Sequence, residues 1–166
     1  FAIAELAPVA EQLDQGGDQA PFFDNLKKLA ELGFMGLNVK EEYGGADAGV
    51  VAFSVAISEI ARACASTAVT VSVSNMVCEV IQSVGNDRQC RQYLPKICSG
   101  AYLAGAFAWT DAGAGADPAG MVNTAVRAGD EGVLKRPKLL ITRAPYAGVF
   151  VFWAGTDPLA RKGIGI

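Results

Sequence analysis

Apolar residues in the first hundred positions recur every three or four residues, which is the period of an α-helix with one buried face. The series opens with Ile3, Leu6, Ala10 and Leu13. Pro8 interrupts this helix and should bend it, because proline lacks an amide hydrogen and crowds the preceding turn. A pair of glycines then ends it.

The second predicted helix begins at Pro21, where the missing N–H group would have no helical partner in any residue. Its buried stripe comprises Phe22, Leu26, Leu29 and Ala30. Gly33 follows the last turn and suits the left-handed conformation that closes many helices. Residues 40–45 (KEEYGG) are then predicted to form a loop.

Two more apolar stripes and a short helix complete this half. The stripes comprise Val50, Phe53, Ile57, Ile60 and Cys64, then Val69, Val73, Val77, Val80 and Val84. The second stripe is rich in β-branched residues, so propensity alone would allow a strand, but its length and spacing favour a helix. A helix over residues 87–96 follows, with Pro95 near its end.

The apolar period changes after Gly100. Short apolar runs at residues 102–109, 121–127, 138–142 and 149–154 are separated by glycine and proline turn signals, which is typical of strands. Helices followed by strands predict an α+β fold rather than alternating βαβ units. We therefore expect an all-α helical domain over residues 1–100 and a partial antiparallel β-domain over residues 101–166.

Composition narrows the function classes. Apolar residues make up 51% of 166 residues, enough for a core, and the net charge is −3, without the clustered basic face that favours nucleic acid. No apolar run approaches the roughly 20 uncharged residues that span a bilayer, so no membrane span is expected, and the amino terminus is not a secretory signal. Both ends resemble cuts within a longer protein.

Catalysts and metal sites based on histidine are excluded, because the chain contains no His. The four cysteines, Cys64, Cys78, Cys90 and Cys98, include no C-x-x-C pair and lie in apolar or helical contexts. We expect buried, reduced thiols and no metal site. A pair of disulfides is the alternative.

The stretch with most potential for chemistry is residues 110–117 (TDAGAGAD), a glycine-rich loop after a predicted strand. Glycines allow backbone N–H groups to converge on an anion such as a pyrophosphate. The alternative is an ordinary surface turn. No helical pattern follows as in a Rossmann fingerprint, and no Gly-Lys-Ser/Thr follows as in a P-loop.

Two threonines and a pair of acidic residues are further candidates for chemistry. Thr110 and Thr142 end two predicted strands and could donate hydrogen bonds to a flat heterocycle, or simply fill strand positions. Glu41 and Glu42 adjoin Tyr43, but adjacent residues do not face each other on a regular element. A solvated loop is the better interpretation of that acidic pair.

Separated stretches of this chain resemble the acyl-CoA dehydrogenase family, in the family's order. They are residues 29–37 (LAELGFMGL), 41–45 (EEYGG), 57–66 (ISEIARACAS), 93–100 (YLPKICSG), and the 110–117 loop together with 138–142 (KLLIT). The resemblance covers nearly the whole chain and implies a helical domain and the first half of a β-domain.

The resemblance also implies an activity. Members of this family bind FAD without a covalent bond and remove two hydrogens from the α and β carbons of an acyl-CoA thioester. A carboxylate takes the α-proton, flavin N5 receives the β-hydride, and the reduced flavin passes its electrons to an electron-transfer flavoprotein. The family implies a homotetramer in the bacterial cytoplasm or the mitochondrial matrix. Its catalytic Glu lies in a third domain, so no catalytic residue is expected in this chain, which should be inactive alone.

The same resemblance implies roles for particular residues. Those expected to bind the cofactor are Phe107, Trp109, Thr110, Gly115, Ala116, Leu140, Ile141 and Thr142. Val73, Val77 and Ala116 are expected near the acyl-CoA, although the two valines could equally be helix core.

This chain departs from the family pattern within the flavin region. Asp111, Ala112 and Ala116 stand where Glu, Pro and Ser are usual, and Leu140 stands where Trp is usual. Losing the hydroxyl removes a hydrogen bond, and losing the indole removes a large aromatic surface. The alternative is therefore a non-catalytic acyl-CoA-binding or assembly module with weakened FAD binding.

Overall fold

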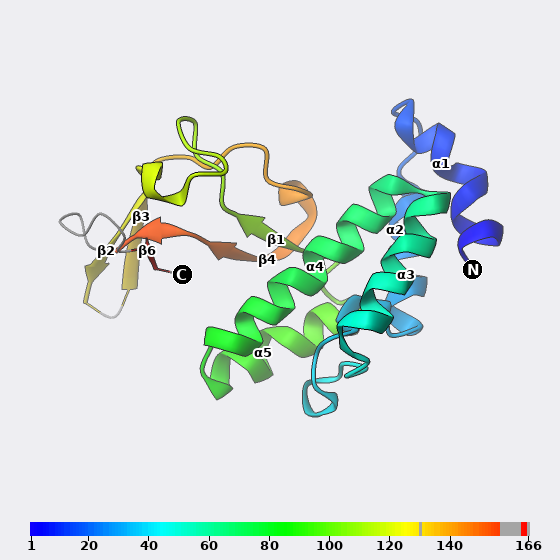
Figure 1. Ribbon diagram of the computed structural model, residues 1–166, viewed down its shortest axis with the longest axis horizontal. Coiled ribbons are helices and arrows are strands. Elements are labelled where there is room, and N and C mark those ends of the chain that lie inside the picture. The colour runs from blue at the N-terminus through cyan, green and yellow to red at the C-terminus, as the bar shows by residue number, and fades with distance from the viewer. Residues whose placement is uncertain (130, 157–163, 166) are drawn as a thin grey trace. The chain divides into compact units, whose positions relative to one another are not determined.

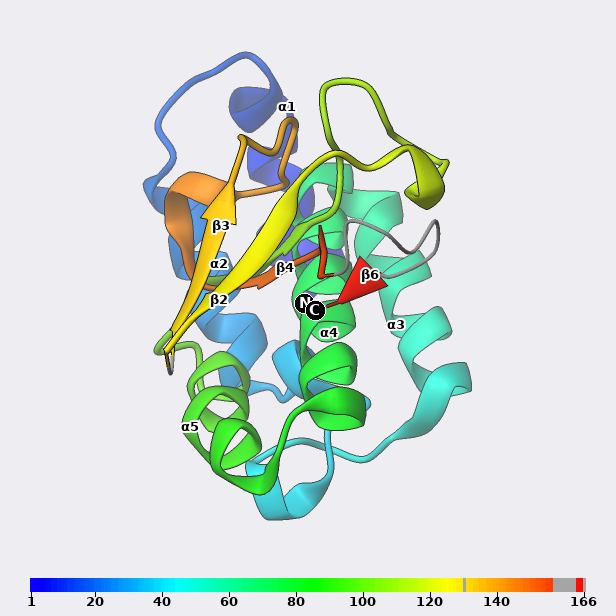
Figure 2. The same ribbon diagram turned by 90° about the vertical axis from the view of Figure 1, so that its left-hand side faces the viewer.

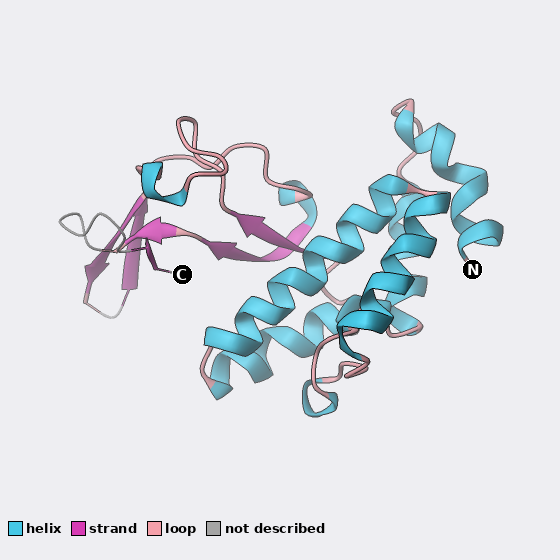
Figure 3. Cartoon of the chain, viewed as in Figure 1, coloured by secondary structure: helices cyan, strands magenta, loops and turns pink. Residues whose placement is uncertain are grey.

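The computed structural model describes every residue of the chain except 130, 157–163 and 166 (Figure 1). The chain forms two compact units. The first, here called the helical unit, comprises Phe1–Ala106 and Arg143–Val149, and the second, the strand unit, comprises Phe107–Thr142 and Phe150–Ile166. Figure 3 shows helices in the first and mostly strands and loops in the second.

All the predicted helices are present. The helical unit contains a π-helix at Ala2–Leu6, then α1 (Ala7–Asp14), α2 (Ala20–Glu31), α3 (Gly49–Ala63), α4 (Ala65–Val84) and α5 (Asp87–Cys98). Short 3-10 turns lie at Phe34–Gly36 and Glu41–Tyr43, the second within the predicted loop. Helices α3 and α4 pack together, and α4 also packs on α5 (Figure 1).

The amino-terminal helix is interrupted near Pro8, as predicted. The π-helix ends at Leu6 and α1 begins at Ala7, which places Pro8 in the first turn, where its missing N–H group costs nothing. The predicted apolar face is only partly buried: Leu6 is fully buried, whereas Ile3 is 86% exposed. The wider π turns change the angular spacing of side chains, so the 3.6-residue stripe does not apply to Ile3.

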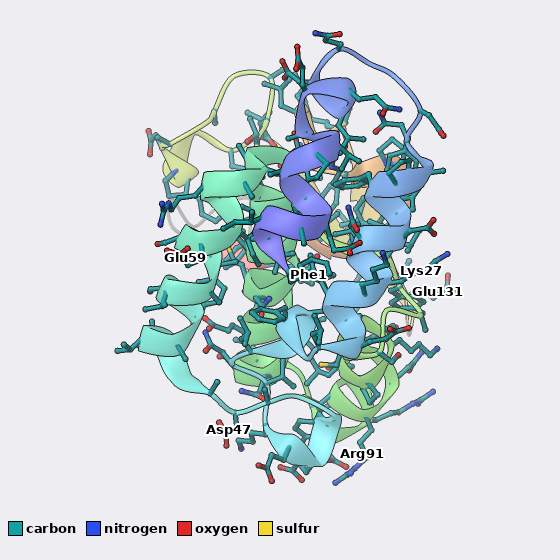
Figure 4. All side chains as sticks on the ribbon, turned by 90° about the vertical axis from the view of Figure 1, so that its right-hand side faces the viewer. Phe1, Lys27, Asp47, Glu59, Arg91 and Glu131 are labelled. Atoms are coloured by element: carbon teal, nitrogen blue, oxygen red, sulfur yellow. The ribbon has the colours of Figure 1, made fainter. Side chains whose placement is uncertain are left out.

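Helix α2 matches its prediction. Pro21 lies in the first turn, and the four residues of the predicted stripe are all buried. Gly33 has a φ of 82°, the left-handed conformation expected after the last turn. Figure 4 shows the charged side chains of Lys27, Glu59 and Arg91 on the outer faces of α2, α3 and α5.

The apolar stripes of α3 and α4 are only partly correct. In α3, Ile60 is buried but Val50 is 68% exposed; in α4, Val77 is fully buried but Val69 and Val84 are 49% and 62% exposed. The buried face of α4 includes small polar residues that hydropathy assigns to the outside: Thr67, Thr70, Ser74 and Asn75. Asn75 and Ser74 form hydrogen bonds with neighbouring segments, which stabilises these polar side chains inside the protein.

A polar stripe on α4 supports the irregular segment that follows α2. Asn75 accepts a hydrogen bond from the Leu37 N–H at 2.8 Å and donates to the Phe34 carbonyl at 2.9 Å. One turn and two turns later, Glu79 accepts from the Asn38 side chain, and Gln82 accepts from the Lys40 N–H at 2.9 Å. Buried backbone groups are thus satisfied by side chains, as they must be outside regular structure.

Helix α4 also passes the length and composition test for a membrane span, contrary to our expectation that no segment would. It has 20 residues, and its most apolar window has a mean hydropathy of 1.2. Half of that apolar stretch is buried inside the structure, and one such helix is weak evidence for a membrane span.

Helix α5 begins with a capping box. Asn86 accepts from the Gln89 N–H, and the Gln89 side chain accepts from the Asn86 N–H, both at 2.9 Å. The helix continues through Pro95 to Cys98, two residues beyond the predicted end. Pro95 has no N–H to donate to the preceding turn, but its carbonyl still accepts from the Ser99 N–H at 3.0 Å, which closes the last turn.

The strand unit contains a hairpin of β2 (Thr124–Ala128) and β3 (Glu131–Lys135), which are antiparallel neighbours (Figure 2). Its sheet order is β3-β2-β5-β6, with β5 at Ala154–Gly155 and β6 at Ile164–Gly165. Strand β5 is parallel to β2 and antiparallel to β6, so the predicted antiparallel pattern has one parallel exception. A separate pair joins β1 (Ala104–Ala108) to β4 (Ala147–Phe152). The predicted α+β class is confirmed.

The predicted strand at residues 138–142 is wrong. That segment pairs with no strand among the described residues and turns through Leu140, whose φ of 55° lies in the left-handed region. The cause is a different use of its first two residues: the Lys138 side chain is buried against Asp111, and the Leu139 N–H bonds to the Thr110 carbonyl. Strand β3, which sequence patterning missed, is exposed along its whole length and so lacks an apolar alternation.

Candidate functional site

The centre of the candidate site is a buried carboxylate, Asp111, at the start of the glycine-rich loop. Its Oδ2 accepts from the backbone N–H groups of Val122 at 2.7 Å and Asn123 at 3.0 Å. Its Oδ1 accepts from the Asn123 amide at 2.7 Å and from Lys138 Nζ at 2.6 Å. One side chain therefore joins the beginning of the loop to residues 122 and 123, which follow the loop, and to a segment after β3.

Lys138 completes this arrangement. Its side chain is 3% exposed and that of Asp111 is 1% exposed, so the ion pair is shielded from water. Lys138 Nζ also donates to the Trp109 carbonyl at 2.7 Å and lies 5.3 Å from the centre of the Phe152 ring. Such short charged bonds in a dry interior are strong.

The pKa of Asp111 lies below its usual value. Burial alone would raise it, but the hydrogen bond from Lys138, the backbone N–H groups of Val122 and Asn123, and the Asn123 amide together outweigh burial. Asp111 is therefore a carboxylate in the folded protein and has no proton to give. It is a structural anion rather than a general acid.

The glycine-rich loop is fixed at its start and open in its middle. Asp111 and Ala114 exchange backbone hydrogen bonds, and the Trp109 indole N–H donates to the Gly115 carbonyl at 2.8 Å. A Cβ added at Gly113 or Gly115 would meet nothing within 4 Å. The backbone is thus accessible there, as a cradle for an anionic group requires.

The structure brings most of the predicted cofactor residues together within the strand unit. The Leu139 N–H donates to the Thr110 carbonyl at 2.9 Å, which places residues 138–142 beside the strand-to-loop junction. Phe107 stacks on Trp109 with ring centres 6.0 Å apart, and Trp153 contacts both rings. Gly115 and Ala116 lie exposed in the loop.

The last three predicted residues differ in environment. Leu140 is 93% exposed, while Ile141 and Thr142 are partly buried in the turn. They do not form the flat strand edge that the sequence predicted. A backbone turn here still presents main-chain groups, but Leu140 contributes no buried surface.

The two predicted acyl-CoA residues on α4 lie in the helical unit. Val77 is fully buried and packs so tightly on Gly105 that an added Cβ would lie 2.8 Å from its side chain. The neighbouring Ser74 hydroxyl accepts from the Gly105 N–H at 3.2 Å. Val73 is partly exposed. This burial agrees with the helix-core alternative for Val77, and the pocket role of both valines stays a prediction.

Sequence patterning missed the ion pair and Asn123. The apolar pattern predicts Lys138 only as the first residue of a strand and gives Asn123 no role. The signal was weak: an isolated lysine at the start of an apolar run and an aspartate at the start of a glycine loop, with opposite charges. Nothing in local spacing says that residues 111, 123 and 138 meet.

Metal ligation and disulfide bonding find no support in the described part of the chain. No cluster of three potential metal ligands occurs among those residues, and the four cysteines are buried free thiols. The reduced state of these cysteines stays a prediction.

Comparison with known proteins identifies the family. The model of the acyl-CoA dehydrogenase N-terminal domain matches residues 1–101. An acyl-CoA dehydrogenase of Bacillus subtilis is 38% identical over 166 residues, covering 99% of this chain and 43% of the relative. The crystal structure of acyl-CoA dehydrogenase from Geobacillus kaustophilus superposes with a TM-score of 0.86 at 31% identity, over 99% of this chain and 43% of that one.

A third comparison concerns a structure with its cofactor. Acyl-CoA dehydrogenase complexed with FAD from Bacillus anthracis superposes with a TM-score of 0.83 at 33% identity, over 95% of this chain and 27% of that one. The chain thus spans less than half the length of these relatives. With the domain match and the fold in agreement, the chain belongs to the acyl-CoA dehydrogenase family.

Proposed function

We propose that the whole protein is an FAD-dependent acyl-CoA dehydrogenase that removes hydrogens from the α and β carbons of an acyl-CoA thioester. The observation that carries the proposal is the hydrogen bond from Leu139 N–H to the Thr110 carbonyl, which joins the two predicted flavin segments. The open backbone at Gly113 and Gly115 lies in the same unit. These residues fit an elongated cofactor with a flat ring at one end and a pyrophosphate in its middle.

Each part of the site has a defined task in this proposal. The Thr110 hydroxyl and the backbone of Trp109 bind the edge of the flavin ring, and the backbone of Gly115 and Ala116 binds the pyrophosphate. The turn at residues 140–142 borders the ring. FAD, when bound, supplies the hydride acceptor. The base that takes the α-proton is assigned to no residue of this chain.

The proposal extends to partners and place. An electron-transfer flavoprotein reoxidises the flavin, the whole subunit forms a homotetramer, and the protein works in a bacterial cytoplasm or a mitochondrial matrix. These assignments follow from the family resemblance, and sedimentation and reoxidation assays test the first two.

The decisive experiment is an absorbance spectrum of the whole subunit purified from its natural source, followed by addition of acyl-CoA. A flavin band that bleaches with acyl-CoA in the absence of oxygen supports the dehydrogenase. A protein without flavin, which neither takes up added FAD nor oxidises acyl-CoA, overturns it.

A second candidate is an acyl-CoA-binding or assembly module with weakened FAD binding. The observation favouring it is Leu140, which is 93% exposed and replaces a flavin-facing aromatic residue of the family. Calorimetric binding of acyl-CoA by a flavin-free subunit would support this candidate. If Leu140→Trp with Ala116→Ser then restores FAD uptake, the two substitutions explain the loss.

A further inference from the structure

Three separate stretches of the strand unit meet at one buried charge pair that does not itself face the proposed cofactor. We propose that Asp111 and Lys138, together with Asn123, are positioning residues that hold the glycine loop in the conformation that receives FAD. This inference rests on the proposed function. It assigns a task to side chains that no comparison above identifies as part of the site.

The first step is the link across the loop entrance. Lys138 Nζ donates both to the Trp109 carbonyl at 2.7 Å and to Asp111 Oδ1 at 2.6 Å. These two acceptors lie on either side of Thr110, whose carbonyl receives the Leu139 N–H. Residues 138 and 139 therefore fix both the position and the direction of the backbone at Thr110.

The second step is closure of the loop. Asp111 Oδ2 accepts from the N–H groups of Val122 and Asn123, so one carboxylate joins the start of the loop to the segment that follows its end. The Asn123 amide donates to Asp111 at 2.7 Å and to the Pro137 carbonyl at 3.1 Å. Closing a loop of this length costs chain entropy, which these bonds offset before any ligand arrives.

The middle of the glycine-rich loop stays open between the ends that Asp111, Asn123 and Lys138 hold. Gly113 and Gly115 have no neighbour within 4 Å of an added Cβ, and both lie between the clamped ends. Glycines are conformationally permissive, so the loop needs its ends fixed to present one arrangement of N–H groups. The buried pair fixes these ends through its hydrogen bonds to residues 109, 122 and 123.

The fourth step excludes a direct role. The two side chains are 3% and 1% exposed and neutralise each other, so neither charge is available to a pyrophosphate or to a substrate proton. Their effect on a ligand must pass through the backbone of residues 109–123. They are positioning residues rather than catalytic ones.

The test uses the whole subunit and the variants Lys138→Met, Lys138→Met with Asp111→Asn, and Asn123→Ala. For each we would measure the FAD dissociation constant, the thermal midpoint, and the visible circular dichroism of the bound flavin. Lys138→Met should weaken FAD at least tenfold. The double variant leaves no unpaired buried charge, so its thermal midpoint should recover. FAD should still bind weakly, and the circular dichroism of the bound flavin should still differ from that of the wild type.

Two further variants keep the test interpretable. Asn123→Ala removes hydrogen bonds without leaving a new unpaired charge in the interior. It therefore tests the positioning role even if Lys138→Met does not fold, and it should weaken FAD binding several-fold. Lys28→Met breaks another 2.6 Å ion pair, with Glu5, on the exposed surface of the helical unit. It should leave FAD affinity unchanged.

The outcomes separate the two levels of the proposal. If the double variant recovers stability and FAD affinity together, the pair serves only the fold and the positioning role is overturned. Unchanged FAD affinity in Asn123→Ala and Lys138→Met overturns it as well, while the proposed function stands. A wild-type subunit that binds no FAD overturns both.

Discussion

The interiors of the helical unit and the strand unit differ in the size of their apolar side chains and in whether they contain a buried charge. In the helical unit the largest fully buried side chains include Phe22, Leu26, Met35 and Leu94. In the strand unit, the described buried apolar residues are three alanines and Val151, and the polar residues Asp111 and Asn123 are buried among them. An apolar interior tolerates repacking of similar volume, whereas a buried ion pair fails when either partner is lost.

This contrast also provides separate probes. Both tryptophans of the chain, Trp109 and Trp153, lie in the strand unit, so tryptophan fluorescence reports on that unit. Circular dichroism at the helical band reports mainly on the helical unit. A substitution that affects one signal before the other shows which interior it disturbs.

The largest effect is expected from Lys138→Met. It leaves the Asp111 carboxylate buried without its cation, which should lower the free energy of unfolding by about 3–5 kcal/mol. Denaturant unfolding followed by tryptophan fluorescence measures this loss. A loss below about 1 kcal/mol would mean that the pair behaves like an exposed one.

A cavity in the helical unit is expected to have the next largest effect. Leu26 is 2% exposed, and Leu26→Ala should lower the free energy of unfolding by about 2–5 kcal/mol through lost burial and an unfilled space. Helical circular dichroism measures it. Leu32, 55% exposed just after α2, is the matched control, and an equal loss in Leu32→Ala would contradict the assigned core.

Asn75→Ala tests the polar part of the helical interior. It leaves the Leu37 N–H and the Phe34 carbonyl without partners, so a loss of about 1–3 kcal/mol is expected. Thermal unfolding monitored at the helical band gives the value. Met76→Ala, at the exposed neighbouring position, should change little, and equal effects of the two variants would count against the bridging role.

Acidification should lower the stability of the strand unit more in the wild type than in Asp111→Asn, which has no carboxylate to protonate at this position. The pKa of Asp111 is lower folded than unfolded, so its stabilisation is present above the unfolded value of about 4 and is lost as the pH falls through the folded pKa. Fluorescence-detected unfolding at pH 6 and pH 3 should show a larger loss in the wild type than in Asp111→Asn. Parallel pH curves would exclude this contribution.

The smallest effect is expected from Leu140→Gly. Leu140 has a φ of 55° and is 93% exposed, so glycine removes backbone strain and little contact. We expect stabilisation of up to about 1 kcal/mol, measured by fluorescence-detected unfolding. Destabilisation would show that the leucine makes contacts that its exposure does not suggest.

The sequence predicted best where structure depends on near neighbours. Helix α2 was correct in its proline start, its buried stripe and the left-handed Gly33, because each depends on residues within one or two turns. The valines of α4 show the limit of this reasoning. Their spacing predicted a helix correctly, but not which face is buried. That face includes Asn75, whose hydrogen bonds go to a segment some forty residues away in the chain.

The sequence predicted several residues of the candidate site but not the contacts that bring them together. The glycine loop and Thr110 were recognised by resemblance, and the structure places Leu139 beside them. The apolar run at residues 138–142 predicts a strand. The prediction fails because it takes no account of the ion pair between Lys138 and Asp111. A contact between residues 27 positions apart leaves no periodic trace in the chain.

The polar stripe on α4 has a consequence for how this chain can change over evolution. Asn75 and Gln82 bind main-chain groups of residues 34–40, so they recognise the path of that segment rather than its side chains. Substitutions at Lys40, which is exposed, would keep the hydrogen bond whatever the new side chain. Proline is the exception, because it has no N–H to offer Gln82. The segment is thus free to vary in surface chemistry while its course beside α4 stays the same.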